Sequence, residues 1–254
     1  MFIDSHAHIS QEPLCNSVAH VIKRAHIAEV DNIINVCTDR QSLERGLHLA
    51  KRYPEVALSG AITPHDADKE GSLLFSLFAK AAREKKLVAI GETGLDYYYY
   101  EATKEAQLFY LEKHFALARE TGLPVILHCR EAFPDLFEAA SKWYDCGKAV
   151  LHCFTGSVPE AEEALKRGWY ISFSGIITFK KSHALREVVK AIPPDKILIE
   201  TDSPYLAPEA YRGQTNEPAF VVEVAREIGK IWQQDAGMVG KITAENARRF
   251  FALD

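Results

Sequence analysis

The chain has 254 residues and a formal net charge of −5, from 30 Lys and Arg against 35 Asp and Glu. Hydrophobic residues make up 47% of it, enough for a sizeable core, but no apolar run reaches the roughly 18 residues of a membrane span. A mildly acidic chain is not a general polyanion binder, so a nucleic-acid substrate would have to be held by local basic residues and metal ions.

In chain order, short β-branched apolar runs alternate with longer amphipathic segments. The predicted strands are residues 2–8, 32–38, 56–63, 87–93, 124–130, 148–154, 170–175 and 196–202. Strands that alternate with helices form parallel sheets, and eight such units in a chain of this length predict a closed barrel. The predicted fold class is therefore α/β, a (β/α)8 TIM barrel, with residues 1–254 as one domain.

Two of the predicted helices can be placed more closely. Residues 104–121 have one apolar stripe and are followed by Gly122, a residue type that commonly ends helices. A last helix, at about residues 243–250, lies outside the repeat. The apolar stripe consists of Leu108, Leu111, Phe115 and Ala118. An open doubly wound sheet, the main alternative, usually has a glycine-rich loop after its first strand, and here that strand ends in His-Ala-His-Ile-Ser instead.

The cysteines and the N-terminal segment indicate in which cellular compartment the protein is expected. The five cysteines are an odd number without paired spacing, which predicts reduced thiols in a reducing compartment. The segment MFIDSHAHIS has neither the basic nor the apolar region of a secretory signal. We therefore expect a cytoplasmic protein without a membrane partner, and a monomer is compatible with the sequence. The cysteines are Cys15, Cys37, Cys129, Cys146 and Cys153.

Polar residues with metal-binding side chains end five of the predicted strands. Because active sites of parallel barrels form at the carboxyl ends of the strands, we expect these side chains to meet. Strand alternation puts two histidines of the first strand on one face, and three later candidates lie two residues after Ile90, Ile126 and Val150, which are expected to fill the barrel. The candidates are His6, His8, Glu92, His128, His152 and Asp202.

Four imidazoles and two carboxylates are a suitable ligand set for two divalent cations, with Mg, Mn or Zn as candidates. A lone histidine at a strand end is more often structural, but six such residues on one rim favour metal binding. Glu92 is the expected bridging ligand because it lies in the middle of the set. The cysteines after His128 and His152 are expected to face away and pack against helices. Five other histidines are expected to be solvated: His20, His26, His48, His114 and His183.

Six sequence blocks resemble, in the same order, the signature blocks of the TatD family of metal-dependent hydrolases and deoxyribonucleases. The blocks are Phe2-Ile-Asp-Ser-His-Ala-His, Gly91-Glu-Thr-Gly-Leu-Asp-Tyr, Pro124-Val-Ile-Leu-His-Cys-Arg, Leu151-His-Cys-Phe-Thr-Gly, Glu200-Thr-Asp-Ser-Pro-Tyr-Leu and Arg212-Gly-Gln-Thr-Asn-Glu-Pro. The resemblance implies a TIM barrel, hydrolase activity and a divalent-metal site formed by the same six residues. Members include Mg-dependent 3′→5′ exonucleases of DNA and RNA, and some are reported to deacylate D-aminoacyl-tRNA.

The third strand departs from the pattern of this family. It commonly ends in Gly-x-His-Pro-His, whereas this sequence has Thr63, Pro64 and His65 there. The first histidine of that motif contributes to the substrate pocket of nuclease members, so Thr63 bears on nuclease activity more than on metal binding. The retained His65 is placed with the substrate-binding residues.

Further residues are expected to act beside the metal ligands. Asp202 is expected to orient a metal-bound water and accept its proton, with Glu92 as the second catalytic residue. Arg130 either clamps a phosphate or forms a rim salt bridge with Glu131 or Asp135.

The residues after Glu92 leave two interpretations open. Asp96 and Tyr97 either line the pocket or shape its loop, and we count Tyr97 among the substrate-binding candidates. The run Tyr97–Tyr100 either stacks on bases or packs as an outer wall. Three more residues are given supporting roles: Asp4 and Glu200 behind the ligating histidines, and Asn216 at the loop after the last strand.

Three functions are compared. The first is a phosphodiesterase of nucleic-acid ends, a 3′→5′ exodeoxyribonuclease acting on single-stranded DNA. The second is an amidohydrolase-type ester or amide hydrolase such as a D-aminoacyl-tRNA deacylase. Many amidohydrolases bridge two metals with a carboxylated lysine at the end of strand four. This chain has Glu92 there, which favours the first function. The third is a non-enzymatic metal scaffold, which an open six-ligand rim argues against because structural sites are closed and four-coordinate.

Overall fold

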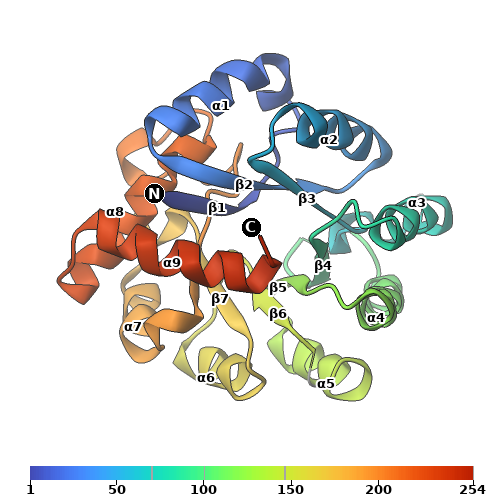
Figure 1. Ribbon diagram of the computed structural model, residues 1–254. Coiled ribbons are helices and arrows are strands. Elements are labelled where there is room, and N and C mark those ends of the chain that lie inside the picture. Colours follow the sequence, from blue (N-terminus) through green and yellow to red (C-terminus); the bar gives the residue numbers. More distant parts are fainter. Residues whose placement is uncertain (70, 100, 146, 254) are drawn as a thin grey trace.

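Eight parallel strands form one sheet in the order β1 to β8, with helices around its outside (Figure 1). The computed structural model describes residues 1–69, 71–99, 101–145 and 147–253, so Tyr100 of the tyrosine run and Cys146 lie outside the described residues. The strands are β1 Phe2–Ala7, β2 Val30–Cys37, β3 Val56–Gly60, β4 Ala89–Asp96, β5 Val125–Arg130, β6 Ala149–Leu151, β7 Tyr170–Phe173 and β8 Ile197–Ile199. The helices are α1 Val18–Ile27, α2 Arg40–Arg52, α3 Gly71–Arg83, α4 Lys104–Thr121, α5 Phe133–Trp143, α6 Val158–Lys166, α7 His183–Ala191, α8 Val221–Trp232 and α9 Ala236–Phe251. The predicted (β/α)8 barrel is confirmed.

The barrel closes where β1 meets the segment after β8. The amide of His8 donates to the carbonyl of Ser203 at 2.7 Å, and the amide of Asp202 donates to the carbonyl of His6 at 2.9 Å. The carboxylate of Asp4 accepts hydrogen bonds from the amide and the hydroxyl of Thr201 at 2.8 and 2.6 Å. The seam of the barrel therefore brings candidate ligands of the first and last strands together through main-chain bonds.

Strand β4 differs from the prediction in its length and its register. It runs to Asp96, so Glu92 lies within the strand and Asp96 ends it, instead of Asp96 lying in the following loop. Ile90 pairs with Val125 and Thr93 with Leu127, so β4 has an extra residue between these pairs. Such a bulge re-aims a side chain. Ala89, and not Ile90, packs inside the barrel, so the prediction that Ile90 fills the barrel was wrong. The bulge explains how Glu92 still reaches the barrel mouth.

Helix α4 has the predicted boundaries. The hydroxyl of Thr103 accepts a hydrogen bond from the amide of Ala106 at its start, and Gly122 ends it in the left-handed region with φ of 73°. Three residues of the predicted stripe are buried and Leu108 is half-buried. His114 is fully buried, so its predicted solvation was wrong: it lies three residues after Leu111 and four before Ala118, on the buried face.

The last helix is longer than predicted and covers the amino-terminal end of the barrel (Figure 1). Its residues Ala244, Ala247, Phe250 and Phe251 form one buried cluster with side chains from the strands. The strand members of this cluster are Ile3, Ile34, Ala89, Ile126, Val150, Tyr170 and Leu198. The barrel is therefore closed at this end. In the part of the chain that is described, no helix combines the length and apolar character needed to cross a membrane.

Candidate metal centre

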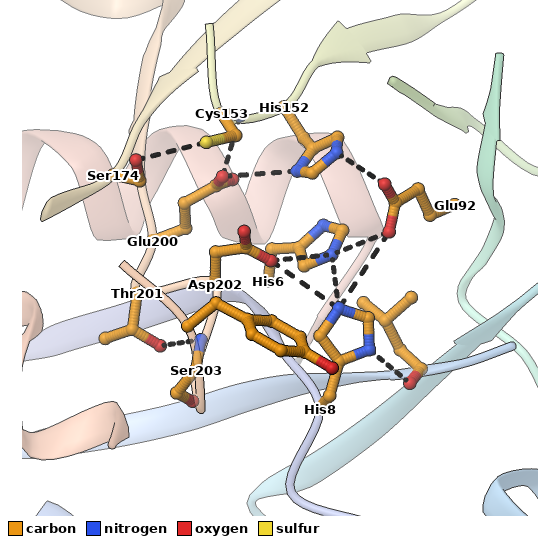
Figure 2. Close-up of polar contacts among 12 residues, drawn as sticks. His6, His8, Glu92, His152, Cys153, Ser174, Glu200, Thr201, Asp202 and Ser203 are labelled. Carbon is orange, nitrogen blue, oxygen red and sulfur yellow. Dashed lines mark hydrogen bonds and ion pairs between the residues drawn. The ribbon is translucent and has the colours of Figure 1, made fainter. Parts of the chain in front are cut away.

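The two histidines of the first strand face each other at the mouth of the barrel. The Nε2 atoms of His6 and His8 are 3.2 Å apart (Figure 2). Nδ1 of His8 lies 3.2 Å from the carbonyl oxygen of Val36. A carbonyl only accepts, so Nδ1 of His8 donates, and Nε2 of this ring presents its lone pair to the mouth of the barrel when the ring is neutral.

Glu92 lies between all four histidines. Its Oε1 atom is 2.9 Å from Nδ1 of His128 and 2.9 Å from Nε2 of His152. Its Oε2 atom is 3.4 Å from Nε2 of His6 and 3.9 Å from Nε2 of His8. One carboxylate therefore reaches two histidine pairs, as a bridging ligand must.

Two glycines allow this close approach of β4 to β5. Gly91 has φ of 151°, and a Cβ atom there would lie 2.6 Å from the Cβ of Ile126. Gly94 has φ of 145°, and a Cβ atom there would collide with the carbonyl oxygen of His128. Side chains are strongly disfavoured in this backbone region. The sequence Gly-Glu-Thr-Gly is thus a local requirement for placing Glu92 against its neighbours.

Asp202 completes the group from the segment after β8. Its Oδ1 atom is 3.5 Å from Nε2 of His8 and 3.7 Å from Nε2 of His6. The residue adopts φ of 57°, a left-handed conformation that is uncommon for aspartate. Asn216 donates from its side chain to the carbonyls of Thr201 and Tyr205 at 2.8 and 2.6 Å, and so fastens this segment as predicted.

Two further carboxylates support the histidines from behind. Oε1 of Glu200 lies 3.3 Å from Nδ1 of His152, which agrees with its predicted role. Oδ2 of Asp96 lies 2.8 Å from Nε2 of His128. Asp4 does not have the predicted role, because its carboxylate binds mainly Thr201, and burial raises its pKa to about 8.

The buried carboxylates and imidazoles of the centre shift one another's pKa values. Burial raises the pKa of Glu92, but the charge of His152 and hydrogen bonds from His128 and His152 hold that pKa well below its usual range. Burial lowers the pKa of His152, but Glu92 and Glu200 raise it well above the ordinary value. The pKa of His6 is lowered by burial and by the charge of His152, which leaves His6 neutral. An ionised Glu92 therefore lies beside a cationic His152 and a neutral His6. Burial lowers the pKa values of the other two imidazoles, His8 and His128, but nearby carboxylates raise them.

The donor atoms of these residues fit divalent cations. Three groups have all their ligand atoms within 4.8 Å of one another: His6, His8 and Glu92; Glu92, His128 and His152; His6, His152 and Asp202. Nδ1 of His6 is buried without a hydrogen-bond partner among the described residues, and Nε2 of this ring offers a lone pair to a cation when Nδ1 carries the proton. Imidazole nitrogens and carboxylate oxygens without competing donors are a suitable environment for a transition-metal or magnesium ion.

The centre opens into a cavity of about 810 Å³. Its lining includes His65, Tyr99 and Arg130 near the ends of β3, β4 and β5, and, across the barrel, Phe179 and Tyr205 after β7 and β8. The guanidinium of Arg130 lies 3.7 Å from the ring centre of Tyr98 and 4.8 Å from that of Tyr99. Stacking of this kind positions a guanidinium while its edge stays able to donate.

Of the two alternatives for Arg130, the rim salt bridge with Glu131 or Asp135 is not found within the described residues. The carboxylate of Asp135 instead accepts from the hydroxyl of Tyr97 at 2.8 Å and pairs with Lys104. Tyr97 is therefore turned away from the cavity, and Tyr99 takes the place expected for it. Thr63 does line the cavity, but its hydroxyl donates to Asp66 at 2.9 Å.

Two residues near the site differ from the sequence interpretation. Cys153 does not face away, because β6 ends at Leu151 and Cys153 adopts φ of 44°; its Sγ lies 3.2 Å from Oγ of Ser174 at the cavity. His114 binds Thr93 beside Glu92, with Nδ1 2.8 Å from the hydroxyl, and burial lowers its pKa to about 3. The place of His114 in the apolar stripe of its helix was the signal that could have revealed this.

The chain matches the family model described as TatD related DNase over residues 3–252. It is 35% identical over 255 residues to the metal-dependent hydrolase YabD of Bacillus subtilis, with 100% of both chains covered. It is 37% identical over 240 residues to the 3′-5′ ssDNA/RNA exonuclease TatD of Erwinia tasmaniensis, covering 92% of this chain and 93% of the relative. Among solved structures, the TatD homolog YJJV of Escherichia coli K12 has a TM-score of 0.93 at 27% identity, covering 100% of this chain and 98% of the other.

Proposed function

Because the chain belongs to the TatD family of metal-dependent hydrolases, we propose that it removes nucleotides from the 3′ ends of single-stranded nucleic acid. The observation that carries this proposal is the position of Arg130. Its guanidinium stacks on two tyrosines and lies in the wall of the cavity that Glu92 and three of the histidines, His8, His128 and His152, also line. A cation there complements a phosphodiester held at the metal centre.

Two divalent ions, of Mg, Mn or Zn, are held in this proposal by His6, His8, Glu92, His128, His152 and Asp202. Such ions supply a bound water of lowered pKa and hold non-bridging phosphate oxygens. Glu92 would be the ligand common to both ions, since its two oxygens face different histidine pairs. The buried rings of His6 and His152, stacked with centres 4.0 Å apart, keep the donor atoms in place.

Asp202 accepts the proton of the attacking water. Its carboxylate is in the cavity wall, and only one of its oxygens is paired with His6 and His8. Burial raises its pKa, but a hydrogen bond from His8 and the charge of His152 lower it below the ordinary value. The group is therefore ionised at neutral pH and able to receive a proton.

Substrate contacts are assigned to the wall opposite Tyr205. Arg130 binds a phosphate, His65 donates to the same or the next phosphate, and the exposed ring of Tyr99 stacks on a base. Tyr97, the original candidate, acts through the loop: its bond to Asp135 connects the end of β4 with α5. Thr63 leaves this wall less basic than a histidine would, and we expect a modest rate.

The net charge of −5 favours a thin, flexible strand end over a duplex, which needs a broad basic surface. The test uses a single strand labelled at its 5′ end beside a circular single strand, with Mg or Mn. We expect progressive shortening of the linear strand only, abolished by chelator and by His128→Ala. The matched control is His26→Ala, because His26 is an exposed histidine of α1 that pairs with Glu55 outside the cavity.

Two results would contradict the proposal. Cleavage of the circular strand at the same rate would exclude dependence on an end. An intact linear strand, together with chelator-sensitive hydrolysis of D-aminoacyl-tRNA, would assign the centre to the ester-hydrolase alternative.

A further inference from the structure

The ring of His128 is held between two carboxylates. Nδ1 is 2.9 Å from Oε1 of Glu92, and Nε2 is 2.8 Å from Oδ2 of Asp96. A neutral imidazole has one N–H and one lone pair, so the partner of one nitrogen decides what the other can bind. Glu92 belongs to the candidate metal group and Asp96 lies on the far side of the ring, which makes Asp96 the partner that sets this choice.

Asp96 is itself fixed as a pure acceptor. Its Oδ1 atom accepts the amides of Tyr98 and Tyr99, both at 2.9 Å. Its own amide donates to the side-chain oxygen of Gln107 at 2.8 Å, and the residue is 1% exposed. With Oδ1 occupied by two donors, Oδ2 faces Nε2 of His128, and the favourable arrangement is an N–H at Nε2 that donates to it.

We propose that Asp96 is a positioning residue that keeps the proton of His128 on Nε2 and thereby directs the Nδ1 lone pair toward Glu92 and His152. This inference rests on the proposed metal centre, because its consequence is a ligand of correct orientation. The same carboxylate holds the turn of Tyr98 and Tyr99 on which Arg130 stacks, so one side chain aligns the metal centre and the phosphate-binding wall.

An alternative interpretation is that Asp96 and His128 belong to a third cation site. His65, Asp96 and His128 also have ligand atoms within 4.8 Å of one another, and Nε2 of His65 is 3.7 Å from Oδ2 of Asp96. A third ion there would need the lone pair of Nε2 of His128 while Nδ1 binds the neighbouring ion. A neutral ring cannot supply both, so we favour the positioning role.

Asparagine at position 96 separates positioning from simple structural damage. If its oxygen stays on the two tyrosine amides, its NH2 group faces Nε2 of His128, which must then accept, and the proton moves to Nδ1. Asp96→Asn should therefore impair metal binding more than Asp96→Ala, which removes the preference without reversing it. A residue that only supports the fold would show the opposite order, since alanine removes more contacts.

The experiment is titration calorimetry with Zn²⁺ on the full chain, with thermal unfolding as a check on the fold. We expect about 10- to 100-fold weaker binding of one of two ions in Asp96→Asn, and a smaller loss in Asp96→Ala. Asp66→Asn is the matched control, because its carboxylate lines the same cavity without touching a ligating histidine. A single distant charge changes affinity by less than about fourfold.

Nitrogen-15 NMR of the Zn-loaded wild-type protein tests the proton position without any variant, with His128→Gln used for assignment. We expect a metal-bound Nδ1 and a slowly exchanging proton on Nε2. Four results would each overturn the inference. Two concern affinity: Asp96→Asn binds Zn²⁺ as tightly as the wild type, or Asp96→Ala loses more affinity than Asp96→Asn. The other two are a metal bound to Nε2 of His128, and three ions per chain of which Asp96→Ala removes one. Absence of Zn²⁺ binding by the wild-type protein would instead overturn the proposed metal centre.

Discussion

Replacing Glu92 by glutamine tests whether one side chain joins two cation sites. Glu92 is 7% exposed, and its carboxylate lies 2.9 to 3.9 Å from ring nitrogens of four histidines. Breaking a buried charge pair by removing one partner costs about 3–5 kcal/mol, and each 1.4 kcal/mol is about tenfold in affinity. We therefore expect cation binding to weaken by roughly 10²- to 10⁴-fold, and both ions to be affected because each histidine pair loses its shared ligand.

The assay is calorimetric titration of the chelator-treated protein with Mn²⁺, beside the control Glu200→Gln. Glu200 also contacts His152, but on the side of the ring turned away from Glu92. Glu200→Gln should weaken the binding of only one of the two ions, by about 10- to 100-fold. Two ions bound by Glu92→Gln with affinities within about threefold of wild type would refute the shared-ligand reasoning, since loss of a buried partner has a far larger effect.

Three other changes probe the same centre. Asp202→Asn should lower kcat by about 10²- to 10⁴-fold with the fold intact by circular dichroism, and a rate within a few-fold of wild type would remove Asp202 from the reaction. Because the pKa of His152 is raised well above its ordinary value, the metal-free ring is protonated at neutral pH. Cation binding should therefore release protons and weaken as the pH falls. Equal binding heats in buffers of different ionisation enthalpy would contradict this. Gly94→Ala should destabilise the fold by more than about 2 kcal/mol in urea unfolding, whereas Gly122→Ala, where a Cβ meets nothing within 4 Å, should cost about 1 kcal/mol.

The barrel and the position of its site follow from a local pattern that the sequence displays directly. Apolar runs of strand length recur eight times, and a polar ligand type stands near the carboxyl end of five of them. The convergence of His6, His8 and Asp202 depends only on strand order and on the seam between the first and last strands, which topology rules anticipate. That these residues bind metal stays a prediction.

The errors arise where a residue depends on backbone geometry that alternation alone does not describe. Glu92 enters the mouth because of a bulge, and Cys153 enters the cavity because its strand ends two residues earlier in a left-handed turn. Arg130, at the end of β5, stacks on rings of the loop that follows β4, and Tyr97 turns outward to Asp135. Such contacts depend on which side chains a turn brings together, and no periodicity in the sequence reports that.

The closure of the barrel by α9 has a consequence for any polymer that the centre acts on. Because Phe250, Phe251 and two alanines of α9 pack against the lowest layer of strand side chains, the barrel is a blind socket and not a tunnel. A strand end can enter the mouth but cannot be threaded past the centre. The released fragment must leave by the same opening through which the next end arrives. Product release and binding of the next end thus use the same opening, and this favours dissociation of the polymer between successive cleavages.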